Sequence, residues 1–319
     1  MVQPRLVMPD GDPDITQILR MPAYAERVAA LGGITVFENA PRSPGEFSQR
    51  ISGFQAVLLG AKLPDEVMRE AEAMRLISFA GYGVANYVNL AIAAERGITV
   101  TNTPHYGDAA VAEHTIALLL AVARNVLSGD RAVRGGDWRQ PQGIQLAGKT
   151  AGIVGYGGIG ARVAAILEAM GMRVLVWTRR QVPSRLDGTQ HRFADLPELM
   201  SCSDVVSLHL ALDDSTWGIL DAALLGLMRR GAILVNTARA ELIEQGALEA
   251  LVAKGALRAG LDVFTSEPLP ADSPLCLSPA VVMSPHQAYN TPGSLERMLD
   301  VAVGNVKAFF EGCPVNVIV

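Results

Sequence analysis

Three apolar, strand-like segments in the C-terminal half of the chain each lead to a side chain capable of acid–base or anion-binding chemistry. Arg239, Glu267 and His286 follow these segments. Because the carboxyl ends of parallel strands meet at one edge of a sheet, where such folds bind ligands, we expect the three groups to converge. His286 can donate a proton to a carbonyl oxygen, and Glu267 can hydrogen-bond the other ring nitrogen and favour the imidazolium. Arg239, permanently cationic, can hold a carboxylate and polarise a ketone.

A glycine-rich segment upstream predicts a dinucleotide site. It lies between the apolar run 151–154 and the helical pattern of 162–170, and it reads Gly155, Tyr156, Gly157, Gly158, Ile159, Gly160. Gly155 permits a tight turn, Gly157 lets the backbone approach a pyrophosphate, and Gly160 lets the helix pack close to the strand. The helix N-terminus then offers free amides to the anion. This strand–turn–helix context favours cofactor binding over an ordinary glycine turn.

Each proposed catalytic residue also has a purely structural explanation. Arg239 could bridge to a surface carboxylate, Glu267 could cap the turn before Pro268, and His286 could be a buried core histidine. The three together, in this order beside a cofactor turn, favour the catalytic interpretation.

The residues after the second strand of this unit, 173–177, bear on cofactor choice. An acidic residue here would bond the ribose hydroxyls of NAD, whereas the chain has Thr178, Arg179 and Arg180. A hydroxyl and two guanidinium groups can bond a 2′-phosphate, so we expect NADP(H) to be preferred, with NAD(H) as the alternative. The other explanation is an exposed strand end with solvated arginines.

Composition excludes several classes of protein. The chain has 319 residues, 50% of them hydrophobic and 18% charged, which suits a two-domain α/β enzyme. A net charge of −5 gives no general attraction to nucleic acid or to an anionic membrane. The three cysteines are scattered, and the first residues do not resemble a signal peptide. We therefore expect a cytoplasmic protein with no nucleic-acid or membrane partner.

The elements that must position these residues read as alternating strands and helices. In the first hundred residues, strands are expected at 33–37, 56–60 and 76–80, and helices at 15–31, 64–73 and 90–96. A long helix at 108–127 leads into the glycine-turn unit. That unit continues through strands near 205–208, 232–236, 260–263 and 281–284, and a final helix at 295–312 returns to the first domain.

This pattern predicts an α/β protein with two doubly wound, Rossmann-like domains, each with a parallel sheet, and an active site in the cleft between them. Residues 1–101 and 288–319 would form a flavodoxin-like, substrate-binding domain. Residues 102–287 would form the dinucleotide-binding domain.

Motifs along most of the chain resemble those of the D-isomer-specific 2-hydroxyacid dehydrogenase family, which includes glyoxylate/hydroxypyruvate reductases and phosphoglycerate dehydrogenases. The matching segments are 96–104, 112–114, 155–160, 207–210, 236–239, 262–268 and 285–286.

The resemblance implies roles for particular residues. Arg239, Glu267 and His286 would be catalytic, Asp262 would lie near the nicotinamide carboxamide, and Thr237 to Arg239 would line the nicotinamide ribose. Further implied or candidate positions are His209 and Ala238 for the cofactor, and Gly81, Tyr82, Gly83, Val84 and Tyr289 for the substrate. The resemblance also implies a homodimer, with the 108–127 helix and the arm 131–140 in the interface.

Some positions depart from the family pattern. Ala240 and Ala211 replace an expected glycine and proline, and Asn86 and Asn89 stand where acidic residues are common. None removes a catalytic group, but the identity of the substrate cannot be inherited from a known member.

We therefore expect NAD(P)H-dependent reduction of a small 2-keto acid to the D-2-hydroxy acid, a reversible hydride transfer. Two alternatives stay open: a nucleotide-sensing, corepressor-like binding protein, and a formate- or phosphite-type dehydrogenase on the same fold. Glu113 and His114 resemble half of a zinc motif, but no second histidine follows at helical spacing, so no metal is expected.

Overall fold

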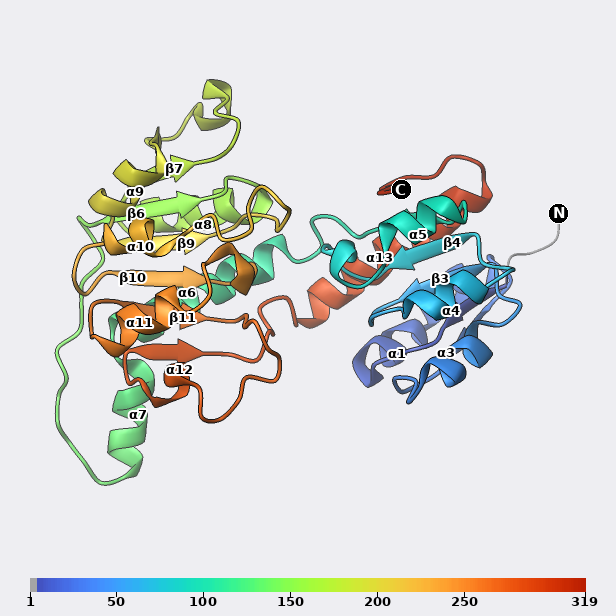
Figure 1. Ribbon diagram of the computed structural model, residues 1–319, viewed down its shortest axis with the longest axis horizontal. Helices are drawn as coiled ribbons and strands as arrows, with labels where there is room; N and C mark the ends of the chain where they lie inside the picture. Colours follow the sequence, from blue (N-terminus) through green and yellow to red (C-terminus); the bar gives the residue numbers. More distant parts are fainter. Residues whose placement is uncertain (1–4) are drawn as a thin grey trace. The chain divides into compact units, whose positions relative to one another are not determined.

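The computed structural model describes residues 5–319, which form two compact units (Figure 1). One unit comprises the residues up to Gly107 together with Thr291–Val319, and the other comprises Asp108–Asn290. The sequence places the corresponding boundaries after residues 101 and 287.

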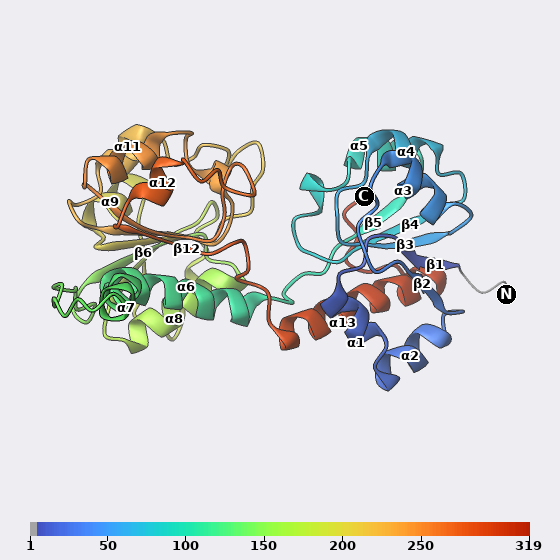
Figure 2. The ribbon, with the colours of Figure 1, turned by 90° about the horizontal axis from the view of Figure 1, so that it is seen from below.

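The first unit is built on a five-stranded parallel sheet in the order β2-β1-β3-β4-β5. Its strands are β1 Leu6–Met8, β2 Ile34–Val36, β3 Ala56–Leu59, β4 Leu76–Phe79 and β5 Thr99–Thr101. Every residue of β1, β3 and β4 is buried, as expected for a parallel sheet covered on both faces. Helices α3 Pro44–Ile51, α4 Asp65–Glu70 and α5 Leu90–Glu95 cover one face. The other face is covered by α1 Pro13–Leu19, α2 Pro22–Ala29 and α13 Pro292–Phe310 (Figure 2).

The final helix lies in the first unit, as predicted, and packs on β4. The prediction of one helix over 15–31 is wrong. The structure has α1 Pro13–Leu19 and α2 Pro22–Ala29, with Arg20 as the C-cap of the first helix. Pro22 lacks an N–H and cannot continue a helix, but it fits the first turn of a new one.

The second unit contains a seven-stranded parallel sheet in the order β12-β11-β10-β9-β6-β7-β8. Its strands are β6 Thr150–Val154, β7 Arg173–Trp177, β8 Arg192–Phe193, β9 Val205–Leu208, β10 Ile233–Asn236, β11 Arg258–Leu261 and β12 Val281–Met283. The chain winds outward from β6 in both directions, so the strand order reverses between β6 and β9. Ligands of doubly wound folds bind at the carboxyl edge beside such a switch point.

Helices cover both faces of this second sheet, with a separate apolar core on each side (Figure 2). One layer contains α6 Asp108–Ala123, α7 Val126–Arg134 and α8 Gly158–Ala169. The other contains α9 Leu196–Cys202, α11 Ala247–Ala253 and α12 Pro274–Leu277, and the short α10 Ala222–Gly226 contacts α9 and α11.

The expected helix over 108–127 is divided in the structure. Helix α6 ends at Ala123, Asn125 adopts a left-handed conformation with φ +55°, and α7 starts at Val126 after a bend of 61°. Asparagine tolerates this conformation better than most residues, which explains the position of the break. Within residues 5–319, no single helix combines the length and apolar character of a membrane span; α6 and α7 meet the criterion only as a bent pair.

Candidate active site

The glycine turn after β6 has the geometry that a pyrophosphate needs. Gly155 has φ +99°, and a Cβ on it would lie 2.6 Å from the backbone oxygen of His209. A Cβ on Gly160 would lie 2.0 Å from the backbone oxygen of Gly155, so α8 can approach the strand this closely only with glycine there. Gly157 is the N-cap of α8, and a Cβ there would meet no described atom within 4 Å. The two crowded positions shape the backbone, and the open one leaves room for an anion at the helix N-terminus.

Tyr156, inside this turn, packs inward. It is 6% exposed, and its hydroxyl lies 2.9 Å from Nδ1 of His191, whose Nε2 lies 3.3 Å from a carboxylate oxygen of Glu168. Arg185 donates a hydrogen bond to the backbone oxygen of Tyr156. Burial raises the pKa of Tyr156 and lowers the pKa of His191, so both are uncharged at neutral pH. The sequence did not identify His191 or Arg185, because their partner is a tyrosine whose direction a glycine motif does not specify.

Other residues predicted to bind the cofactor lie on α8 and directly after β7. Gly158 is the first residue of α8, and Ile159 packs partly buried against the core that α8 shares with α6. Thr178 directly follows β7, and Arg180 is exposed two residues further on.

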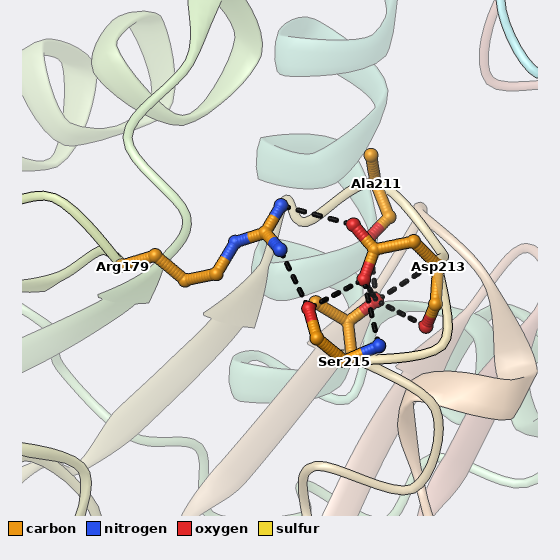
Figure 3. A network of polar contacts seen from close by, with 5 residues as sticks. Arg179, Ala211, Asp213 and Ser215 are labelled. Atoms are coloured by element: carbon orange, nitrogen blue, oxygen red, sulfur yellow. Dashed lines mark hydrogen bonds and ion pairs between the residues drawn. The ribbon is translucent and has the colours of Figure 1, made fainter.

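Arg179 reaches from the end of β7 to the loop after β9 (Figure 3). Its guanidinium lies 2.9 Å from a carboxylate oxygen of Asp213 and 2.5 Å from Oγ of Ser215. The sequence identified Arg179 but neither partner. The strand order explains the contact, since β7 and β9 both neighbour β6.

His209 lies at the carboxyl end of β9, and its Nε2 is 2.9 Å from Oγ of Ser207. Burial lowers the pKa of His209 to about 3. The imidazole is therefore neutral at physiological pH and brings no positive charge to the glycine turn.

The predicted acid His286 and its predicted partner meet. Nδ1 of His286 lies 2.8 Å from one carboxylate oxygen of Glu267, and the other oxygen accepts the amide of Phe264 at 3.0 Å. Both side chains are about one-third exposed, and the ring of Tyr289 stands edge-on to His286 at 6.3 Å between centroids. His286 has φ +49°, a conformation that is uncommon outside glycine and is often found at functional sites. Glu267 thus orients the imidazole and leaves Nε2 for chemistry.

Arg239 is held at the end of the neighbouring strand β10. The side-chain amide of Asn236 donates to the backbone oxygen of Arg239 at 2.8 Å and accepts the amide of Ala238 at 3.0 Å. One Nη of Arg239 donates to the backbone oxygen of Ala238 at 2.6 Å. Thr237 is buried, with its hydroxyl 2.8 Å from that of Thr115 on α6. These bonds fix the backbone, and Arg239 as a whole residue is half-buried.

Asp262 has a structural role that the sequence did not reveal. It is fully buried after β11, and its carboxylate accepts the hydroxyl of Ser284 at 2.5 Å and the amides of Gln287 and Ala288 at 3.0 and 2.9 Å. His114 lies 2.8 Å from the same hydroxyl and 3.5 Å from the carboxylate. Asp262 therefore anchors the chain on both sides of His286, while its predicted contact with the nicotinamide carboxamide stays a prediction.

Burial acts to raise the pKa of Asp262, but the hydrogen bonds from His114, Ser284 and the two amides outweigh it and leave the pKa lowered. The carboxylate is therefore charged at neutral pH. The signal available in the sequence was Glu113-His114, considered there only as half of a zinc motif.

The predicted substrate loop lies in the first unit, after β4. A Cβ on Gly81 would lie 2.6 Å from the ring of Phe79, so this position requires glycine. Tyr82 is 56% exposed, and its backbone oxygen accepts the side-chain amide of Asn102 at 2.9 Å. Gly83 caps the short 3-10 helix Val84–Asn86, and Val84 is buried. These contacts define the backbone of the loop, while its binding of a substrate carboxylate stays a prediction.

Comparison with known proteins relates this arrangement to one family. Residues 116–288 match the family model of the D-isomer specific 2-hydroxyacid dehydrogenase NAD binding domain. A hydroxypyruvate reductase of Blautia hydrogenotrophica is 36% identical over 265 residues, 80% of this chain and 82% of that protein. A glyoxylate reductase of Aeropyrum pernix is 38% identical over 268 residues, 80% of this chain and 79% of that protein.

A solved structure resembles the whole chain in fold. An acyclic imino acid reductase in complex with NADPH and D-Arg superposes with a TM-score of 0.85 and 28% identity, covering 99% of this chain and 100% of that one. These relatives favour neither the corepressor-like alternative nor the formate- or phosphite-type dehydrogenase.

Proposed function

Because the chain belongs to the D-isomer-specific 2-hydroxyacid dehydrogenase family and is an NAD(P)-dependent oxidoreductase of small 2-keto acids, we propose that its substrates are glyoxylate and hydroxypyruvate. The two reductases compared above each match 80% of the chain, and their names carry these substrates. Reduction of hydroxypyruvate would then yield D-glycerate.

The residues present fit a nicotinamide dinucleotide. The open position at Gly157 and the N-terminus of α8 would hold the pyrophosphate. When bound there, the reduced nicotinamide supplies a hydride to the keto carbon.

The chain's own residues handle the proton and the substrate charge. His286 donates the proton on Nε2 to the keto oxygen, so the C=O bond becomes a C–OH group as the hydride arrives at carbon. Glu267 accepts the Nδ1 hydrogen, which fixes the orientation of the ring and directs Nε2 to the substrate. Arg239 binds the substrate carboxylate through its guanidinium fork and polarises the ketone.

The observation that carries this proposal is the His286–Glu267 pair at 2.8 Å, on the same edge of the sheet as the glycine turn. A structural histidine would be enclosed; this one is 30% exposed and keeps one ring nitrogen available. A neighbouring carboxylate on the unused nitrogen is the arrangement that a general acid requires.

The test compares His286→Ala and Arg239→Ala with the native enzyme, using initial rates with glyoxylate, hydroxypyruvate, pyruvate and phenylpyruvate. Turnover should fall by about 10²–10⁴-fold in each variant, while cofactor binding measured by fluorescence stays within error. Asp272→Asn, which changes an exposed acid in the segment between Glu267 and α12, is the matched control and should keep full activity. Full activity of His286→Ala would refute the assignment.

NADPH is the preferred cofactor in this proposal. Its support is the cluster Thr178, Arg179 and Arg180 at the end of β7, together with the NADPH-bound relative of the same fold. Side-by-side initial rates with NADPH and NADH test this preference, and a higher kcat/KM with NADH would refute it.

The enzyme acts as a cytoplasmic homodimer in this proposal. Apolar side chains on and after α7 are unusually exposed; they are Val126 at 53%, Leu127 at 40%, Val133 at 54% and Trp138 at 77%. Light scattering after gel filtration should give a molar mass of two chains for the native protein. The Val133→Glu variant should have the mass of one chain. Fractionation of the source cells tests the location.

A further inference from the structure

The contact between Arg179 and the loop after β9 adds a negative charge where the sequence shows only positive ones. We call Arg179, Asp213 and Ser215 the 179–213 clasp. In it, Arg179 bonds the Asp213 carboxylate at 2.9 Å and the Ser215 hydroxyl at 2.5 Å (Figure 3). Arg179, one of the two arginines expected to bind a 2′-phosphate, thus already forms an ion pair with the Asp213 carboxylate.

The carboxylate of Asp213 is held in place by its own loop. It accepts the hydroxyl and the amide of Ser215 at 2.6 and 2.9 Å. The backbone amide of Asp213 donates to Oγ1 of Thr216 at 2.8 Å, and this hydroxyl in turn donates to the backbone oxygen of Ala211 at 2.8 Å. Thr216 is fully buried, so the loop is anchored from inside. The Ser215 hydroxyl and Arg179 lower the pKa of Asp213, which keeps it charged at neutral pH.

The clasp lies beside the glycine turn. The amide of Gly155 donates to the backbone oxygen of Trp177 at 2.8 Å, and the amide of His209 donates to that of Val154 at 2.7 Å. The ends of β7, β6 and β9 are therefore adjacent, and the clasp joins the outer two across the middle one. In a doubly wound fold the adenosine half of a dinucleotide extends from the turn toward the end of the second strand, here β7.

Another anion can replace the Asp213 carboxylate at Arg179. The side chains of Arg179 and Asp213 are 55% and 42% exposed, and exposed ion pairs are weakly held. A phosphate dianion can compete for the guanidinium, but it must do so beside a fixed carboxylate of like charge.

We propose that Asp213 is a specificity-determining residue that restrains selection of the 2′-phosphate of NADP(H) and thereby keeps NAD(H) usable. This inference rests on the proposed nucleotide site. Asp213 competes with the phosphate for Arg179 and repels it, whereas a ribose 2′-hydroxyl carries no charge and meets neither penalty.

The experiment measures binding without catalysis. Adenosine 2′,5′-bisphosphate and AMP are titrated by calorimetry into the native protein and into Asp213→Asn, Asp214→Asn and Arg179→Gln. Asp214 is the matched control, since it is an exposed acid next in sequence and its substitution changes the net charge equally. Rates with NADPH and NADH are measured on the same samples, separating KM from kcat.

Asp213→Asn should tighten the bisphosphate by about fivefold or more, leave AMP within about twofold, and lower KM for NADPH with kcat unchanged. Asp214→Asn should change these affinities and the KM much less. Arg179→Gln should weaken the binding of the bisphosphate and leave the binding of AMP unchanged. An equal effect of both aspartate variants, or no gain in Asp213→Asn, would overturn the inference. The native enzyme could prefer NADH while Asp213→Asn still shows the stated gain in bisphosphate affinity and the lower KM for NADPH. In that case the proposed NADPH preference fails and the role of Asp213 stands.

Discussion

Two aspartates at the carboxyl edge of the second sheet are used in opposite ways. Asp262 is fully buried and accepts hydrogen bonds from a hydroxyl and two backbone amides, whereas Asp213 is 42% exposed and pairs with an arginine. The pKa of each is lowered, for Asp262 against the opposing effect of burial and for Asp213 by the Ser215 hydroxyl and Arg179. Similar protonation behaviour therefore conceals different environments.

The difference shows how one sheet edge combines rigidity with selectivity. Neutral donors around a buried carboxylate fix the backbone, because each would be left unsatisfied if the carboxylate were removed. An exposed ion pair fixes little, since water and salt can replace either partner, but its charges act on an incoming ligand. The loop that carries the proposed acid His286 needs the first arrangement, and the proposed nucleotide-selecting contact needs the second.

Replacing the buried aspartate is the most severe test of this contrast. Asp262→Ala should lower the free energy of unfolding by about 3–5 kcal/mol, because three donors lose their acceptor in a buried site. Urea unfolding followed by circular dichroism measures the change. Asp213→Ala is the matched exposed substitution and should leave the urea midpoint within error. Equal losses in both variants would contradict the contrast.

The glycine turn contains the same contrast within four residues. Gly160→Ala should cost about 2–3 kcal/mol of unfolding free energy, because its Cβ would overlap the backbone oxygen of Gly155 at 2.0 Å. Gly157→Ala meets open space and should keep the native stability while weakening dinucleotide binding, since the methyl group occupies the position of the anion. Thermal unfolding and cofactor titration of the two variants separate these effects. A stability loss in Gly157→Ala equal to that in Gly160→Ala would show that the turn is uniformly crowded.

The lowered pKa of His209 predicts a dependence of stability on pH. The pKa of His209 falls from 6.5 when unfolded to about 3 when folded, so between these values the unfolded chain binds a proton that the folded chain does not. Stability is therefore fully present above pH 6.5 and decreases as the pH falls below it. From pH 7 to 5.5 this histidine should remove about 1 kcal/mol. Urea midpoints at several pH values measure this; His209→Gln should flatten the slope, leaving the smaller part from His191, and an unchanged slope would exclude His209 as its source.

The sequence predicted the parts of this site that depend on strand order alone. Glu267 and His286 follow strands that prove to be neighbours, β11 and β12, so their contact could be expected from the parallel-sheet rule. The roles of Gly155 and Gly160 could be assigned because each follows from backbone crowding that a fixed spacing imposes.

Other contacts depended on information that spacing does not contain. Asp213 meets Arg179 because β7 and β9 lie on either side of β6, and the loop after β9 folds through a buried Thr216. The division of the expected 15–31 helix followed from the position of Pro22, a signal that was present but was outweighed by the apolar periodicity. The interruption of a helix could thus have been predicted from local sequence, whereas the contact between residues on either side of β6 could be identified only from the folded structure.

The smallest expected effect concerns the stability of the 179–213 clasp. Asp213→Asn and Arg179→Gln, singly and together, should leave the melting temperature unchanged within error, because both groups are solvated before and after the change. Raising the salt concentration should likewise leave stability unaffected while reducing the difference in bisphosphate affinity between native protein and Asp213→Asn. Calorimetric unfolding at low and high salt makes the measurement, with Asp214→Asn as the charge-matched control. A marked destabilisation of the single variants that disappears in the double variant would mean that the ion pair supports the fold, and the division between the rigid and the exchangeable aspartate would no longer hold.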